Sequence, residues 1–189
     1  MRSKAETDAI AGAAQRLVER FVIPPHVERH RACLWYAAGA ASFVERVLGE
    51  RVILQGGSAS WRRVRAEDDD GEVTTHYSYR FEWDERALVE LALGNLPEMH
   101  CWLAVPRTKE IIDLSVKHQQ EACLQLAGMH WPGDPLPEYL WLQVDEHGDN
   151  DDYVYRADRT ACEIAAAAAV QCVRFNYPNK KVDKLLSVS

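Results

Sequence analysis

The chain has 189 residues, of which 47% are hydrophobic and 27% charged, as in ordinary folded proteins; this composition excludes disordered and fibrous classes. It carries 29 acidic and 22 basic residues, and the net charge of −7 argues against a nucleic-acid partner, because phosphate binding needs a basic face. The length predicts one domain over residues 1–189, with a helix at 4–21, a core from about 26 to 175 and a short C-terminal tail.

The sequence predicts a cytoplasmic protein without a membrane partner. No apolar run reaches the roughly 18 residues of a membrane span. The first twenty residues lack the apolar centre of a secretion signal. The five cysteines contain no C-x-x-C pair, which disfavours a disulfide framework or a zinc site made of cysteines alone. They are Cys33, Cys101, Cys123, Cys162 and Cys172.

The first part of the chain is predicted to be helical. Apolar residues recur at helical spacing in 4–21. A second helix is expected from about His26 or Arg31 to Leu48, since its apolar residues repeat every three or four positions. Gly49 then supplies a stop.

The pattern next changes to a period of two, which is typical of strands. Strands are expected at 51–57, 58–64 and 75–81, rich in β-branched and aromatic residues. The acidic run 66–72 is interpreted as a solvated hairpin loop. Residues 85–96 fit either a short helix or a strand.

The last part of the chain mixes both kinds of element. Two strands joined by a turn are predicted at 100–105 and 110–115, followed by a helix at 116–128 and a rigid connector at 131–137. The elements expected after it are a strand at 138–144, an acidic turn at 145–152, a short strand at 153–155 and an alanine-rich helix at 156–175. Helices, then mostly antiparallel strands, then a helix predict an α+β fold, with an antiparallel sheet packed against helices.

Cys33 is a candidate nucleophile because it lies near the start of the second predicted helix. A helix N-terminus carries partial positive charge and free N–H groups, which stabilise a thiolate and lower its pKa. The same N–H groups can bind a developing oxyanion. The alternative is that Cys33 is a small buried apolar residue.

His100 and Asp113 are candidates to activate that cysteine. If the hairpin closes so that Val105 faces Glu110, His100 and Asp113 lie on one face as diagonal neighbours, about 7 Å apart at Cβ. A slip of one residue would place them on opposite faces. The carboxylate would orient the imidazole, leaving its other nitrogen to the thiol. Alternatively, Asp113 caps the following helix and His100 is an interfacial side chain.

Three short motifs carry a family resemblance: CLW at 33–35, HCW at 100–102 and IIDL at 111–114. Their order, with Cys at a helix start, His at a strand start and Asp on the adjacent strand, resembles the transglutaminase-like branch of the papain-like cysteine enzymes. The resemblance covers roughly residues 30–115. One departure is that the tryptophan that directly follows the nucleophile in relatives is one residue later here, at Trp35.

The resemblance implies a core in which a helix bearing the nucleophile packs on an antiparallel sheet. It implies Cys33 as nucleophile, His100 as base and acid, and Asp113 as the group that orients the histidine. The backbone N–H of Cys33 would form part of the oxyanion hole. Relatives often take a second oxyanion donor from a Gln or Tyr side chain, and Gln55 and Tyr36 are the candidates here.

The predicted function is cysteine-dependent acyl transfer, specifically hydrolysis of a peptide or amide substrate through an acyl-enzyme. This chemistry needs no metal and no organic cofactor. Three tryptophans are candidates to line the substrate cleft, since each offers a large flat apolar surface. They are Trp35, Trp102 and Trp131.

Two other functions remain open at this point. The first is a non-catalytic domain that uses the same scaffold to bind a peptide or a protein. The second is a zinc protein, because His26, His30 and Cys33 are spaced to share one helix face and imidazole and thiolate are zinc ligands. The candidates for a fourth ligand are His76, His118 and His130.

Overall fold

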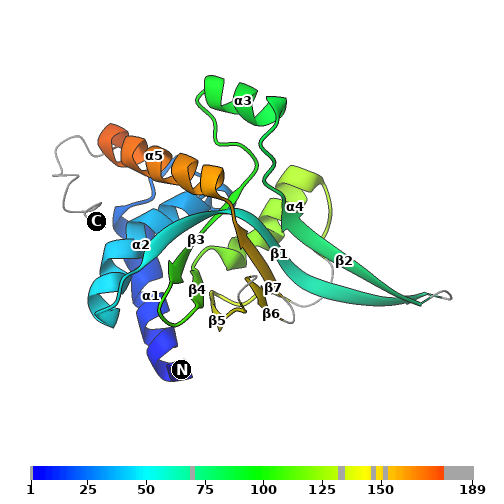
Figure 1. The fold of residues 1–189 in the computed structure, drawn as a ribbon, viewed down its shortest axis with the longest axis horizontal. Helices are drawn as coiled ribbons and strands as arrows, with labels where there is room; N and C mark the ends of the chain where they lie inside the picture. The colour runs from blue at the N-terminus through cyan, green and yellow to red at the C-terminus, as the bar shows by residue number, and fades with distance from the viewer. Residues whose placement is uncertain (1, 69–70, 132–134, 146–147, 151–152, 177–189) are drawn as a thin grey trace.

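Helices cover one face of a curved antiparallel sheet in the computed structural model (Figure 1). The structure describes residues 2–68, 71–131, 135–145, 148–150 and 153–176, and only the backbone at 62–68, 71–78, 149–150 and 172–176. Within these residues the fold is α+β, as predicted. No helix in this described part is both long enough and apolar enough to cross a membrane.

The two N-terminal helices form as the spacing of their apolar residues predicts. Helix α1 spans Lys4–Phe21 and begins with a capping box, in which the side chains of Ser3 and Glu6 satisfy each other's backbone N–H groups. Helix α2 spans Cys33–Leu48 and ends at Gly49, whose φ of 63° is the left-handed conformation that glycine adopts without strain.

Helix α2 begins at Cys33, and the expected extension back to His26 is wrong. The chain makes a turn in which Val27 N–H donates to the Pro24 carbonyl. The short 3-10 helix η1 follows at Arg29–Arg31, and Ala32 then precedes the first residue of α2. Cys33 therefore lies at the N-terminus of a 16-residue helix.

The strands form one antiparallel sheet in the order β5-β4-β3-β1-β7-β6, with β2 also paired to β1. The strands are β1 (Ile53–Asp68), β2 (Gly71–Tyr79), β3 (His100–Val105), β4 (Glu110–Asp113), β5 (Leu140–Gln143), β6 (Asp149–Asn150) and β7 (Tyr153–Ala157). The hairpin of β1 and β2 extends away from the body of the protein (Figure 1). The loop expected at 66–72 is mostly paired strand, because Asp68 still faces Gly71, and its tip lies outside the described residues.

Strand β1 runs through the position where two separate strands were expected, at 51–57 and 58–64. The glycines that suggested a break are needed for close packing instead. A Cβ on Gly56 would lie 2.6 Å from Cε of Met99 and 2.8 Å from the carbonyl oxygen of Ala161. Ala161 belongs to α5 (Arg159–Asn176), so glycine lets this helix lie directly on the strand.

Strands β2 and β3 lie one after the other along the same edge of β1. Tyr79, the end of β2, pairs with Ala59, and His100, the start of β3, pairs with Gly57. The chain between them, residues 80–99, leaves the sheet and carries helix α3 (Glu85–Ala92), which stands off the body in Figure 1. The segment that fitted either a helix or a strand is thus largely this helix.

The later elements follow the predicted order, except that the short strand β6 lies within the segment expected as an acidic turn at 145–152 and pairs with β7. The helical segment expected at 116–128 is a 3-10 turn, η2 (Val116–His118), followed by α4 (Gln119–Ala127). The alanine-rich segment forms α5. The connector predicted at 131–137 lies partly outside the described residues.

Two apolar clusters pack on opposite faces of β3. Cys101, Leu103 and Val105 belong to a cluster shared with α1, α2 and α5. Trp102 belongs to a second cluster, with Trp61, Tyr155 and residues around β4 and β5. Since alternate residues of a strand point to opposite faces, His100 lies on the Trp102 side. Strand β3 therefore places one candidate site residue, His100, at its first position, on the face of the second cluster.

Candidate functional site

The hairpin of β3 and β4 has the register that the sequence analysis required. Val105 faces Glu110 and Leu103 faces Ile112, so His100 and Asp113 share a face. Their side chains meet, with His100 Nε2 2.8 Å from Asp113 Oδ2. Both side chains are fully buried. The predicted contact between imidazole and carboxylate is therefore present.

Asp113 is held by a set of donors as well as by the histidine. Its Oδ1 accepts from the backbone N–H and the hydroxyl of Ser115, each at 2.9 Å, and its Oδ2 also accepts from the Tyr155 hydroxyl at 2.8 Å. The Tyr155 oxygen in turn accepts from the indole N–H of Trp61 at 2.8 Å. A buried carboxylate needs such partners, and these donors fix its orientation toward His100.

Aromatic rings surround the imidazole of His100. The ring of Trp61 meets it edge-on, with centroids 4.7 Å apart, while Tyr79 and Trp102 stack on it at 5.8 and 6.2 Å. These rings exclude water from the ion pair and restrict rotation of the histidine. Trp102 is only 1% exposed and is covered by the protein on the His100 side of the sheet. The expectation that it lines a substrate cleft is therefore wrong.

Cys33 approaches the same imidazole from the N-terminus of α2. Nδ1 of His100 is buried without a conventional hydrogen-bond partner, and Cys33 is the side chain besides Asp113 that interacts with the imidazole. Hydrogen bonding to the side chain of Cys101 and interaction with His100 hold the pKa of Cys33 well below its usual range, against the effect of burial. The cysteine therefore has the environment of a thiolate.

The histidine is correspondingly stabilised as an imidazolium. Burial by itself lowers the pKa of His100, but the charge and hydrogen bond of Asp113, together with Cys33, raise it to about 10. Burial would raise the pKa of Asp113, yet the charge of His100 and the donors around it keep that pKa below its ordinary value. At neutral pH the three side chains thus favour thiolate, imidazolium and carboxylate.

The two candidates for a second oxyanion donor have different surroundings. The Tyr36 hydroxyl donates to Glu19 at 2.7 Å and lies 3.0 Å from Nε2 of His118, so it is used elsewhere and does not fit that role. Gln55 is the partner of Trp102 in the ladder, and its Oε1 accepts from the Trp102 indole N–H at 2.9 Å. This bond orients the amide and leaves its NH₂ group available.

The remaining sequence candidates do not gather at one place. Trp35 packs partly buried against the cluster shared by α1, α2 and α5, and Trp131 packs against the second cluster. His30 of η1 is buried between Glu28, which precedes η1, and Glu121 of α4. Because η1 and a turn replace the continuous helix, His26, His30 and Cys33 do not form the shared face that zinc binding required.

A metal site is not formed by the side chains that the structure describes. No group of three or more His, Cys, Asp or Glu residues among them is arranged to hold a metal ion. His118 is engaged with Tyr36, His130 is exposed, and the side chain of His76 lies outside the described part of the chain.

Sequence reasoning missed the outer part of this network. Tyr155, Trp61 and Ser115 all support Asp113, directly or through one hydrogen bond. Ser115 could have been found, because an Asp side chain often closes a local turn by accepting from the backbone N–H two residues on. Tyr155 and Trp61 depend on the pairing of β7 with β1, where Trp61 faces Tyr153. That pairing joins segments about ninety residues apart, which no local pattern reveals.

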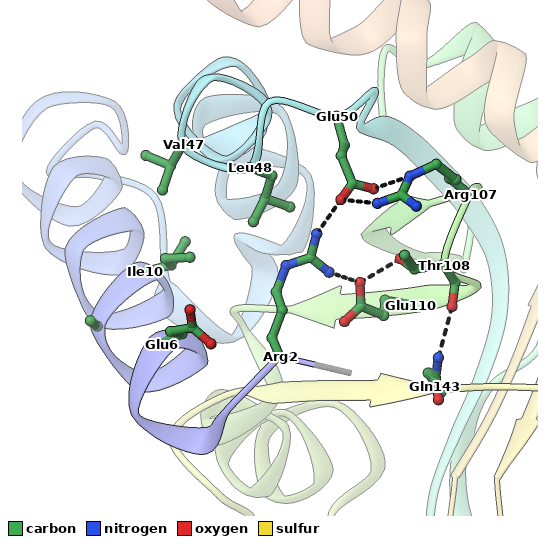
Figure 2. Close-up of a pocket in the computed structure, with 11 residues that line it drawn as sticks. Arg2, Glu6, Ile10, Val47, Leu48, Glu50, Arg107, Thr108, Glu110 and Gln143 are labelled. Carbon is green, nitrogen blue, oxygen red and sulfur yellow. Dashed lines mark hydrogen bonds and ion pairs between the residues drawn. The ribbon is translucent and has the colours of Figure 1, made fainter.

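A separate cavity of about 790 Å³ lies at the other end of the β3–β4 hairpin. At about 3.4 Å per strand residue, the Val105 end of β3 is about 17 Å from His100. Arg2 reaches into it and bridges Glu50 and Glu110, as Figure 2 shows. Arg107 also pairs with Glu50, at 2.5 and 3.0 Å. The charged groups satisfy one another, so this network ties the N-terminus to the hairpin.

Comparisons with known proteins leave the function to be argued from these residues. No family model matches the sequence, and no curated protein is significantly similar to it. A solved structure described as "The crystal structure of genomics APC5867" is similar over 96% of this chain and 77% of its own, with a TM-score of 0.49 and 14% sequence identity.

Proposed function

We propose that the protein is a cysteine-dependent acyl-transfer enzyme that hydrolyses an amide bond. The observation that carries this proposal is the position of His100, buried between the Cys33 thiol and the Asp113 carboxylate, with a 2.8 Å contact to the latter. A purely structural histidine does not need a thiolate on one ring nitrogen and a fully hydrogen-bonded carboxylate on the other. The order of the three residues also supports the proposed transglutaminase-like core.

The first half of the reaction would transfer the acyl group to the enzyme. The Cys33 thiolate attacks the substrate carbonyl carbon, forming a C–S bond and an oxyanion. The N-terminus of α2, including the Cys33 N–H, and the free amide NH₂ of Gln55 would stabilise that oxyanion. The imidazolium of His100 then gives its proton to the leaving nitrogen as the C–N bond breaks, and a thioester on Cys33 remains.

The second half would return the enzyme to its starting state. His100, now neutral, removes a proton from water, which attacks the thioester carbonyl. The C–S bond breaks, the carboxylic acid leaves, and the thiolate and imidazolium form again. Asp113 stabilises the imidazolium and holds the ring orientation throughout, which is the role of a positioning residue.

Acyl-enzyme formation is the direct test. The full chain would be incubated with a mixed library of peptidyl aminocoumarin amides, quenched in acid, and examined by peptide mass spectrometry for a thioester on Cys33. We expect coumarin release and an acylated Cys33 peptide in the unmodified protein, and neither in Cys33→Ala or His100→Ala. Cys162→Ser, which changes a nearby cysteine outside the triad, is the matched control and should retain both.

The result that contradicts the proposal is equally specific. If Cys33→Ala releases coumarin as fast as the unmodified chain, the nucleophile is another group. If no library member acylates Cys33, and no thiol-reactive electrophile labels it faster than a free thiol, the protein is a binding domain on this scaffold.

A further inference from the structure

Two cysteine side chains meet at the candidate site, and the proposed reaction uses only one of them. Cys33 begins α2, and Cys101 is the second residue of β3. The Cys33 thiol interacts with both the side chain and the backbone N–H of Cys101. Cys101 is 1% exposed, within the cluster that also packs against Cys33.

The two sulfurs differ in their chemical state. Cys33 is stabilised as a thiolate, and its residue is partly exposed. The hydrogen bond to Cys33, together with burial, raises the pKa of Cys101 well above its usual value, so this residue stays a thiol. A low-pKa cysteine on a partly exposed residue, beside a second cysteine, is the arrangement in which one sulfur is oxidised and its neighbour resolves the product.

A third cysteine lies close by but is held differently. Gly56 is the partner of Cys101 in the β1–β3 ladder, and the Cys162 sulfur contacts the N–H and the carbonyl of Gly56 at 3.3 and 3.4 Å. These contacts hold Cys162 on the backbone of β1, whereas the side chain of Cys101 hydrogen-bonds with that of Cys33. Cys101 is therefore the partner that the geometry favours, and Cys162 provides a matched control.

We propose that a hydroperoxide converts Cys33 and Cys101 into a reversible disulfide that closes the site. The Cys33 thiolate attacks a peroxide oxygen, forming an S–O bond as the O–O bond breaks, and the released oxygen takes a proton from His100. For hydrogen peroxide the products are a sulfenic acid on Cys33 and water. Cys101 sulfur then attacks Cys33 sulfur, the S–O bond breaks, and the hydroxyl leaves as water with the Cys101 proton.

The disulfide would have a protective and a regulatory consequence. It withdraws Cys33 from acyl transfer, and this consequence rests on the proposed function. It also stops oxidation at a stage that thiols reverse, before sulfinic acid forms on Cys33. The disulfide itself depends only on the two sulfurs and can be tested without any substrate.

The experiment treats the full chain with increasing hydrogen peroxide, blocks free thiols with N-ethylmaleimide and maps unreduced peptides by mass spectrometry. We expect a Cys33–Cys101 linked peptide lighter by about 2 Da than its separate thiols, and recovery of Cys33 alkylation by iodoacetamide after dithiothreitol. In Cys101→Ser and Cys101→Ala we expect no link, and sulfinic acid on Cys33 that dithiothreitol does not reverse. Cys162→Ser should match the unmodified protein.

Two results would overturn the proposed Cys33–Cys101 disulfide. One is irreversible oxidation of Cys33 in the unmodified chain at the same peroxide concentration as in the Cys101 variants. The other is a link from Cys33 or Cys101 to Cys162 instead. A Cys33–Cys101 link without any amide turnover would refute the proposed function and leave the disulfide chemistry standing, while turnover without the link would do the reverse.

Discussion

Replacement of Asp113 by Asn tests the electrostatic argument, because it removes one charge and preserves the shape of the side chain. The carboxylate is the main group that raises the pKa of His100 from 6.5 to about 10. Each pKa unit corresponds to about 1.4 kcal/mol, so the full shift is on the order of 5 kcal/mol between the two protonation states, part of it owed to Cys33. Without the carboxylate, burial lowers the pKa of His100, and the imidazole becomes neutral near pH 7.

Loss of the imidazolium should appear in the reactivity of Cys33. A thiol of ordinary pKa, about 8.5, is only about 1% thiolate at pH 6.5, so the alkylation rate can fall by up to about 100-fold. The assay is iodoacetamide labelling from pH 5 to 9, read at Cys33 by mass spectrometry. Asp84→Asn, which replaces the exposed cap of α3, is the control and should leave the rate unchanged. An Asp113→Asn rate equal to that of the unmodified protein at pH 6.5 would refute the reasoning.

The same variant should change how stability depends on pH. A raised pKa in the folded state stabilises the protein fully below the unfolded value of 6.5, and this contribution is lost as the pH rises through about 10. The lowered pKa of Asp113 contributes above its unfolded value of 3.8. The difference in unfolding free energy between the two proteins should therefore be greatest between the two unfolded pKa values, 3.8 and 6.5, and should shrink toward pH 10. Urea unfolding at several pH values measures it, and a constant difference would contradict the ion pair.

Three further substitutions test the surroundings. Tyr155→Phe removes a donor from Asp113 and an acceptor from a buried indole, so urea unfolding should show a loss of about 1–3 kcal/mol; no loss would mean that the network is not formed. Gln55→Ala should lower kcat by about 100-fold or more without slowing alkylation of Cys33, as expected for an oxyanion donor, and an unchanged kcat would exclude that role. Arg2→Ala leaves the buried Glu110 carboxylate without its cation and should destabilise the fold by about 1–3 kcal/mol in urea unfolding. Adding Glu110→Gln to the same chain should recover part of the lost stability. An unchanged stability of Arg2→Ala would contradict the bridge between Arg2 and Glu110.

The part of the site that the sequence could predict is the part set by local geometry. Cys33, His100 and Asp113 were found because a helix start and a short hairpin follow from spacing and turn residues nearby. The register of β3 and β4 depends on a turn of a few residues, so it could be worked out. The pairing of β1 with β7 depends on packing between distant segments, which is why Tyr155 and Trp61 were missed.

Burial was also beyond the reach of sequence spacing. Trp102 was expected beside a substrate because tryptophan suits cleft walls, yet its alternation with Cys101 and Leu103 places it in the cluster behind His100. The break between two strands that was expected at Gly56 is absent for a related reason. Glycine in a strand can mark a turn or a close approach, and only the position of α5 distinguishes these two.

The course of the chain around α3 separates the candidate site from the surface beside it. Strands β2 and β3 each take their register from β1, at Ala59 and Gly57, so residues 80–99 leave and return at neighbouring points of one strand. The length and sequence of this excursion can therefore vary among descendants of the fold without moving His100 away from Asp113. New recognition surfaces can arise there while His100 and Asp113 keep their places.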